Sequence, residues 1–113
     1  VPTLLKAVGI DAKEPLPGVD LVRVAEGKSD RKTLFGEIFE HDIADIDRPE
    51  ASLLFRWCRQ GHWKLIVPRN ASQPPELYDL AADPREETNL ASEQPQRVLM
   101  LRQQIDAWWS AQN

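Results

Sequence analysis

The feature that most constrains the fold is a pair of short segments in which every second side chain is large and apolar. Residues 52–59 follow this pattern, and residues 62–67 repeat it. A period of two is typical of a β-strand with one buried face. Only Gln60 and Gly61 separate the segments, and a glycine in the second place of so short a connection supplies the positive φ that a tight turn needs. The sequence therefore predicts a β-hairpin.

Two other segments predict further strands, and the last segment predicts a helix. Residues 34–40 are rich in Phe, Ile and Leu with Glu interleaved, and residues 76–80 form a short strand after a proline-rich loop. Residues 95–112 carry apolar side chains three, four and three positions apart, at Val98, Leu101, Ile105 and Trp108. This spacing gives a helix one apolar stripe.

These elements predict an α+β sandwich of two layers, in which the C-terminal helix covers one face of a sheet. We expect the helix to cover the face that carries Phe55, Trp57, Trp63 or Leu65. Cys58 falls on the other side of its strand from Trp57, where a free cysteine is most simply a small buried hydrophobe. A catalytic thiol is the alternative interpretation. No serine lies in the Gly-x-Ser-x-Gly setting of a hydrolase nucleophile.

The first part of the chain differs from the rest. Residues 2–8 predict a short helix, with a proline in its first turn and Gly9 as its C-terminal stop. Residues 10–32 hold prolines, glycines and scattered charges without a sustained period, which is typical of a surface loop. We interpret residues 1–33 as a short helix and a linker that belong with another domain, and residues 34–113 as one domain. The start at Val1 is expected to be a fragment boundary.

Charge and hydropathy exclude two classes of function. The formal net charge is −4 and the isoelectric point is about 5.1, whereas a nucleic-acid surface needs clustered Lys and Arg. No apolar run approaches the roughly 20 residues that cross a bilayer. We therefore expect neither a nucleic-acid interface nor a membrane-embedded segment.

The richest polar cluster lies at the end of the first predicted strand. Glu40, His41 and Asp42 stand together there, and Asp45 and Asp47 follow. Such groups can hold calcium or zinc, but the glycine and terminal glutamate of a calcium-binding hand are missing from the cluster. A solvated acidic loop is the competing interpretation. We predict no metal site and no catalytic residue, and we place Glu40, His41 and Asp42 as candidate substrate-rim residues, since binding residues often lie on loops held by a sheet.

Several phrases stand in a fixed order along the chain. Residues 1–9 begin Val-Pro-Thr-Leu-Leu and end in Gly, and residues 15–21 read Pro-Leu-Pro-Gly-Val-Asp-Leu. Leu-Phe-Gly-Glu follows at residues 34–37, and Arg-Gln-Gly-His-Trp-Lys-Leu-Ile spans residues 59–66. The longest phrase covers residues 76–91 and reads Glu-Leu-Tyr-Asp-Leu-Ala-Ala-Asp-Pro-Arg-Glu-Glu-Thr-Asn-Leu-Ala. In this order the phrases resemble the C-terminal region of the sulfatases, within the alkaline-phosphatase-like superfamily.

The resemblance implies a four-stranded antiparallel sheet with a packed helix, in agreement with the pattern above. It also implies that the parent protein is an arylsulfatase-like sulfuric ester hydrolase, which uses calcium and a formylglycine made from the Cys or Ser of a Cys-x-Pro/Ala-x-Arg motif. Cys58 is followed by Arg-Gln-Gly and departs from that motif. We therefore expect no cofactor in this chain, no activity of the chain by itself, and the N-terminal catalytic domain of the same protein as its partner.

Two other functions remain open at this point. The chain could be an autonomous protein-binding or dimerisation module, and self-association is expected wherever apolar surface stays exposed. It could instead be the C-terminal part of a related phosphonate or phosphodiester hydrolase. The reading frame upstream of Val1 separates these possibilities, because a sulfatase frame contains the nucleophile motif.

Overall fold

The structure is a computed structural model of the chain, and it describes residues 1–16, 18–29 and 31–109. The chain divides into two compact units, Val1–Lys32 and Thr33–Asn113. The interpretation of residues 1–33 as a helix and linker from another domain stays a prediction.

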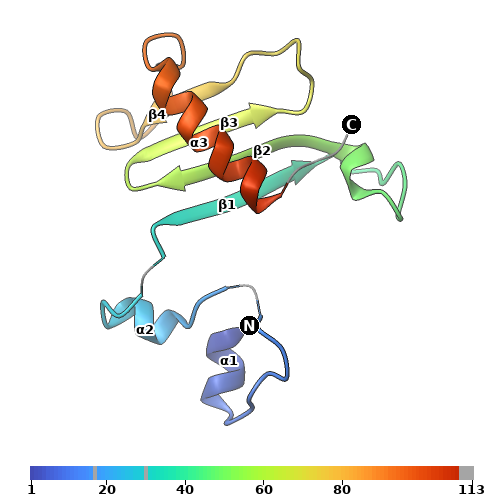
Figure 1. The fold of residues 1–113 in the computed structure, drawn as a ribbon, viewed down its shortest axis with the longest axis vertical. Coiled ribbons are helices and arrows are strands. Elements are labelled where there is room, and N and C mark those ends of the chain that lie inside the picture. Colours follow the sequence, from blue (N-terminus) through green and yellow to red (C-terminus); the bar gives the residue numbers. More distant parts are fainter. Residues whose placement is uncertain (17, 30, 110–113) are drawn as a thin grey trace. The chain divides into compact units, whose positions relative to one another are not determined.

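The second unit is a four-stranded antiparallel sheet with one long helix against it (Figure 1). The strands follow one another in the order of the sequence: β1 (Thr33–Phe39), β2 (Leu53–Gln60), β3 (Trp63–Pro68) and β4 (Glu76–Asp79). A short 3-10 helix, Pro49–Ser52, precedes β2, and α3 spans Pro95–Trp108. The predicted α+β fold class is confirmed. The predicted helix extended to residue 112, and residues 110–113 lie outside the described part of the chain.

The β2–β3 hairpin is confirmed, but its turn lies one residue later than predicted. Gln60 pairs with Trp63, so that Gly61 and His62 form the two-residue turn. Gly61 has a φ of 59°, and positive φ at the first turn position alone is the pattern of a type II′ turn, in which glycine also belongs at that place. The sequence prediction ended the strand too early and therefore counted the glycine as the second turn residue.

The core lies between the sheet and α3. Cys58, Leu65 and Leu77 stand opposite one another on three neighbouring strands, and each has 0% of its surface exposed. Leu101 and Ile105 of α3 close over them and are also fully buried. The predicted apolar stripe of the helix therefore does pack on the sheet, and Cys58 is the small buried hydrophobe that the alternation favoured.

The prediction of which sheet face α3 covers was only half right. Leu65 lies in the core, and the Trp63 ring packs on the same side, 4.1 Å below the guanidinium of Arg97 from α3. Phe55 and Trp57 point to the opposite face. Across this two-residue turn, each odd-numbered residue of β2 pairs with an even-numbered residue of β3, and paired residues lie on the same face of the sheet. Trp57 accordingly stands opposite Ile66 and not opposite Leu65.

The first unit holds two short helices, α1 (Pro2–Ala7) and α2 (Leu21–Ala25). α1 matches the predicted helix, and Gly9 beyond it has the positive φ, 70°, of a helix-terminating glycine. The prediction of an uninterrupted loop over residues 10–32 was wrong at α2. Asp20 caps that helix by accepting a hydrogen bond from the Val22 amide at 3.0 Å, which satisfies an otherwise unpaired donor.

Candidate functional site

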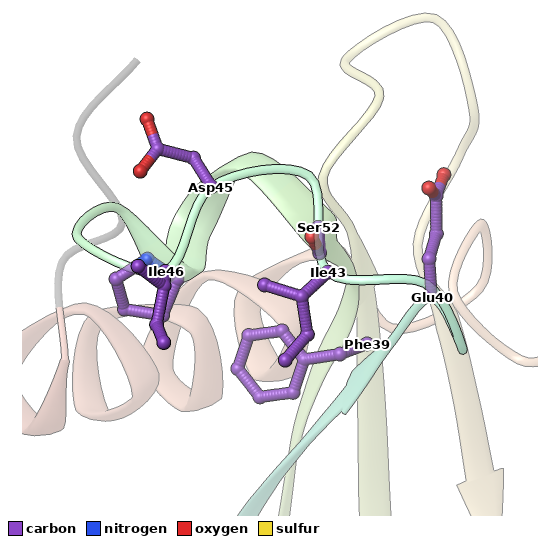
Figure 2. Close-up of a pocket in the computed structure, with 7 residues that line it drawn as sticks. Phe39, Glu40, Ile43, Asp45, Ile46 and Ser52 are labelled. Carbon is purple, nitrogen blue, oxygen red and sulfur yellow. The ribbon is translucent and has the colours of Figure 1, made fainter.

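The loop that leads from β1 to β2 encloses a hollow of about 270 Å³, shown in Figure 2. Its wall consists of seven residues, which are Phe39, Glu40, Ile43, Asp45, Ile46, Pro49 and Ser52. It lies at the end of β1, where the sequence placed the candidate substrate-rim residues. Among the described residues this hollow is therefore the first place to test for a binding role.

A buried serine holds the loop in shape. The Ser52 side chain accepts a hydrogen bond from the Ala44 amide at 2.8 Å, and the Glu40 amide donates to the Ser52 carbonyl at 2.7 Å. Only 4% of Ser52 is exposed. Ser52 therefore organises the loop, and its hydroxyl is committed to the backbone rather than presented to a substrate.

Asp45 carries out a second structural task in the loop. Its carboxylate accepts from the Arg48 Nε at 2.7 Å and from the Asp47 amide at 3.0 Å. The hydrogen bond from Arg48, followed by the backbone bond from Asp47, lowers the pKa of Asp45 below its ordinary value. The carboxylate is thus ionised at neutral pH, with Arg48 as its local counter-ion.

The three predicted rim residues lie in different positions relative to the hollow. Glu40 is part of its wall, whereas His41 and Asp42 belong to the exposed surface of the loop beside it. Within the described ranges, no group of three or more His, Cys, Asp or Glu side chains could hold a metal ion. The structure thus places the three rim residues on one loop, with Glu40 alone in the wall of the hollow.

The hollow is mainly apolar, a feature that the sequence reasoning missed. Ile43 and Ile46 have 71% and 83% of their surface exposed. In Figure 2 their side chains gather with Phe39 on one side of the loop, whereas the carboxylates of Glu40 and Asp45 turn away. A surface of this kind can make van der Waals contact with an apolar group beneath an acidic rim, but it holds no nucleophile beside a base.

Cys58 is unsuited to nucleophilic chemistry. Its Sγ lies 3.8 Å from the Leu101 carbonyl, to which it donates, and its side chain is fully buried. Burial disfavours the thiolate and raises the pKa of Cys58 to about 11. Because the thiolate is the reactive form, the burial of Cys58 and its raised pKa argue against the alternative interpretation as a catalytic thiol.

The part of the longest sequence phrase that follows β4, residues 80–91, forms a hydrogen-bonded loop. The Asp83 carboxylate accepts from the Thr88 amide at 2.8 Å, and this bond and a second from the Glu87 amide lower the pKa of Asp83. Glu86, inside this loop, has a φ of 59°, a left-handed conformation that is uncommon for residues other than glycine. Asp83, at the start of the Asp-Pro turn, therefore collects backbone amides of this loop.

Asn89 joins this loop to the edge of the sheet. Its Oδ1 accepts from the Leu77 amide at 3.0 Å and from the Ala91 amide at 2.9 Å, and its Nδ2 donates to the Pro75 carbonyl at 3.3 Å. The Leu90 amide adds a backbone bond to the Leu77 carbonyl at 2.8 Å. One side-chain amide thus takes the place of a fifth strand along part of β4.

Replacing Asn89 with alanine should lower the free energy of unfolding by about 1–3 kcal/mol, because the amide of the fully buried Leu77 loses its acceptor. Asn89→Asp keeps the oxygen that accepts from Leu77 but replaces the donor to Pro75 with a second acceptor, so it should cost less than alanine while the Leu77 amide stays paired. Urea unfolding followed by tryptophan fluorescence measures both. Equal losses for the two variants would contradict this role.

No protein-family model matches the chain. Among proteins of known function, the chain is 31% identical over 116 residues to Arylsulfatase K of Homo sapiens, with 92% of this chain covered. The chain spans about a fifth of the length of that relative, 20%. No helix in the described part of the chain is both long and apolar enough to span a membrane.

Two solved structures share the fold closely. The phosphonate monoester hydrolase of Agrobacterium radiobacter is 29% identical, with a TM-score of 0.69 over 94% of this chain and 23% of that protein. The protein BT4656, solved with its substrate D-glucosamine-2-N,6-O-disulfate, is 27% identical, with a TM-score of 0.70 over 94% of this chain and 22% of that protein. Both comparisons extend over nearly the whole of this chain and less than a quarter of the other.

Proposed function

Because this chain is related to the sulfatases and corresponds to their C-terminal region, we propose that it is the C-terminal structural subdomain of a sulfuric ester hydrolase. Its partner in this proposal is the N-terminal catalytic domain of the same protein. The observation that carries the proposal is the pattern of coverage, 92% of this chain against 20% of Arylsulfatase K. A match of this form is expected for one subdomain of a larger enzyme.

The chain's own chemistry supports a non-catalytic role. Calcium and formylglycine, which the family implies, do not fit the residues of this chain. Cys58 is buried and lacks the flanking motif, and no cluster of ligands forms among the described residues. We therefore assign no reaction step to this chain, and the nucleophile and the metal of the parent belong to the catalytic domain.

A phosphonate monoester hydrolase is the second candidate for the parent. It is supported by the similarity to the enzyme of Agrobacterium radiobacter, whose identity of 29% is close to that of the arylsulfatase. Determining the reading frame upstream of Val1 tests the assignment. A Cys-x-Pro/Ala-x-Arg motif is expected there, and a start codon immediately before Val1 would favour an autonomous binding or dimerisation module instead.

We further propose that the loop between β1 and β2 reaches the rim of the parent's substrate site, with His41 as the contact residue and with Glu40 and Asp42 beside it. Residues 40–50 hold five carboxylates against one arginine, so this loop repels a sulfate group and suits sugar hydroxyls or a cationic part of a substrate. His41 can donate a hydrogen bond from an exposed position on this loop.

In the parent enzyme, His41→Ala should raise KM while kcat and the unfolding midpoint stay nearly unchanged, because an exposed rim residue contributes to binding rather than to chemistry or to folding. Steady-state kinetics on several sulfated substrates provide the measurement. The matched control is His62→Ala, which changes the chain's other histidine, at the exposed β2–β3 turn, and should alter neither constant. If the His41 variant has the parental KM on every substrate, the proposal that this loop contacts the substrate is contradicted.

A further inference from the structure

The sheet has one face that α3 does not cover. On β1, Phe35 lies on the α3 side and stacks on Trp108, with ring centroids 5.1 Å apart. Leu34, Gly36 and Ile38 alternate with Phe35 and therefore face the other way. Figure 1 shows α3 on a single side of the four strands. The uncovered face thus begins at the edge strand and continues across the sheet.

The half of this face formed by β1 and β2 is apolar. Ile38 stands opposite Phe55, and Gly36 stands opposite Trp57. Leu34 and Ile38 have 45% and 49% of their surface exposed, and the two aromatic residues are half-buried. We define the apolar sheet patch as Leu34, Gly36, Ile38, Phe55 and Trp57. Covering these side chains would remove further apolar surface from water, so the patch can contribute to binding.

Gly36 keeps the apolar sheet patch flat. A Cβ atom at this position would clash with the Trp57 ring, so the indole covers Gly36 and fills the space where a side chain would stand. Glycine is otherwise unfavourable within a strand, and its presence often marks a close approach of other atoms. The Trp57 ring is therefore laid across β1, where it offers a broad apolar surface rather than a projecting side chain.

Apart from the half-buried Ile66, which stands opposite Trp57, the other half of the same face is polar and internally paired. Lys64 stands opposite Tyr78, and its ammonium group lies 2.6 Å from the Glu86 carboxylate. The Tyr78 hydroxyl donates to Glu76 at 2.7 Å, and this hydrogen bond raises the pKa of Tyr78 to about 12. These groups satisfy one another, so they require no partner. The apolar surface that needs a cover is therefore the apolar sheet patch together with the adjoining Ile66.

We propose that the apolar sheet patch is the surface by which this subdomain docks on the catalytic domain of the same polypeptide. The inference rests on the proposed function, because it requires a longer parent chain. About four-fifths of the related arylsulfatase has no counterpart in this chain, which leaves ample protein to cover the patch. A covalently attached domain is also present at a high effective concentration, an advantage that a second copy of the chain lacks.

Hydroxyl-radical footprinting tests this assignment on the parent protein and on the 113-residue chain side by side. Oxidation of Ile38 and Trp57 should be several-fold slower in the parent than in the isolated chain. Leu99 and Met100 of α3 are the control, since they are 53% and 42% exposed on the outside of the helix. Their oxidation should be the same in both proteins. Equal labelling of Ile38 and Trp57 in both, or protection confined to Leu99 and Met100, would overturn the assignment.

A matched pair of variants provides a second readout. Ile38→Lys should lower the unfolding midpoint of the parent and leave that of the isolated chain nearly unchanged, whereas Leu99→Lys should change neither. Protection of the patch that increases with concentration in the isolated chain and is absent from the monomeric parent would identify a second copy as the occupant and overturn the proposal. Sulfate release by the parent reports separately on the proposed function. Protection in a parent that cleaves no sulfate ester supports the docking surface and contradicts the function.

Discussion

Replacing Leu101 with alanine should lower the free energy of unfolding by about 2–5 kcal/mol, the range for deleting a large side chain from a packed core. Leu101 has 0% of its surface exposed and belongs to the cluster formed with Cys58, Leu65, Leu77 and Ile105. Its removal leaves a cavity on the line where α3 meets the sheet. For so small a domain, a loss of this size is a large part of the total stability.

Leu99 is the control for this experiment, because it lies in the same helix two positions away and is 53% exposed. Leu99→Ala should change the free energy of unfolding by no more than about 0.5 kcal/mol, as is usual at the surface. Urea titration of the 113-residue chain measures both variants. Similar effects of the two substitutions would mean that α3 does not pack on the sheet through the Leu101 face.

The isolated chain should release no sulfate from an aryl sulfate above the rate in buffer, with or without calcium. The reason is chemical, because the thiol of Cys58 is buried with its pKa raised to about 11, and Ser52 is committed to the Ala44 amide. Without an activated nucleophile or a preorganised site for a transferring sulfuryl group, no barrier is lowered. Turnover that co-purifies with the chain and disappears in Cys58→Ala or His41→Ala would contradict this expectation.

The strands could be predicted from the sequence because their alternation is local. Each observed strand begins and ends within one residue of its prediction, as with Thr33–Phe39 for residues 34–40. The buried face could not be read in the same way, since β2 carries apolar side chains on one face and Arg56 on the other. Arg56 is polar yet lies on the α3 side, where its guanidinium reaches the Asp106 carboxylate at 2.9 Å. Long-range pairing of this kind leaves no local signal.

α2 escaped prediction for a different reason. Five residues are too few for a hydrophobic period to emerge, and isolated helices of this length are unstable. Its stabilising contacts come from elsewhere in the unit, with the Leu21 amide donating to the Thr3 hydroxyl at 2.8 Å and Lys6 lying 3.1 Å from Asp20. The capping residue Asp20 was the one signal in the sequence, and it precedes a valine-containing segment of low helix propensity.

The apolar hollow lies on the loop that the sequence singled out, but the sequence did not predict the hollow itself. The cluster at residues 40–42 drew attention to this loop, because charged residues stand out in a sequence. The apolar hollow depends on how the loop folds back on Ser52, which presents Ile43 and Ile46 at the surface. Exposed isoleucines in a loop have no recognisable sequence pattern, so only the three-dimensional structure could place them beside Phe39.

The most direct test of the central claim is a single assay on two proteins, in which released sulfate is measured for the full-length parent and for this 113-residue chain on the same aryl and sugar sulfates. The account predicts sulfate release by the parent, and by this chain only the rate seen in buffer. Release of sulfate by the chain alone, or a parent that cleaves phosphonate monoesters and no sulfate ester, would contradict it.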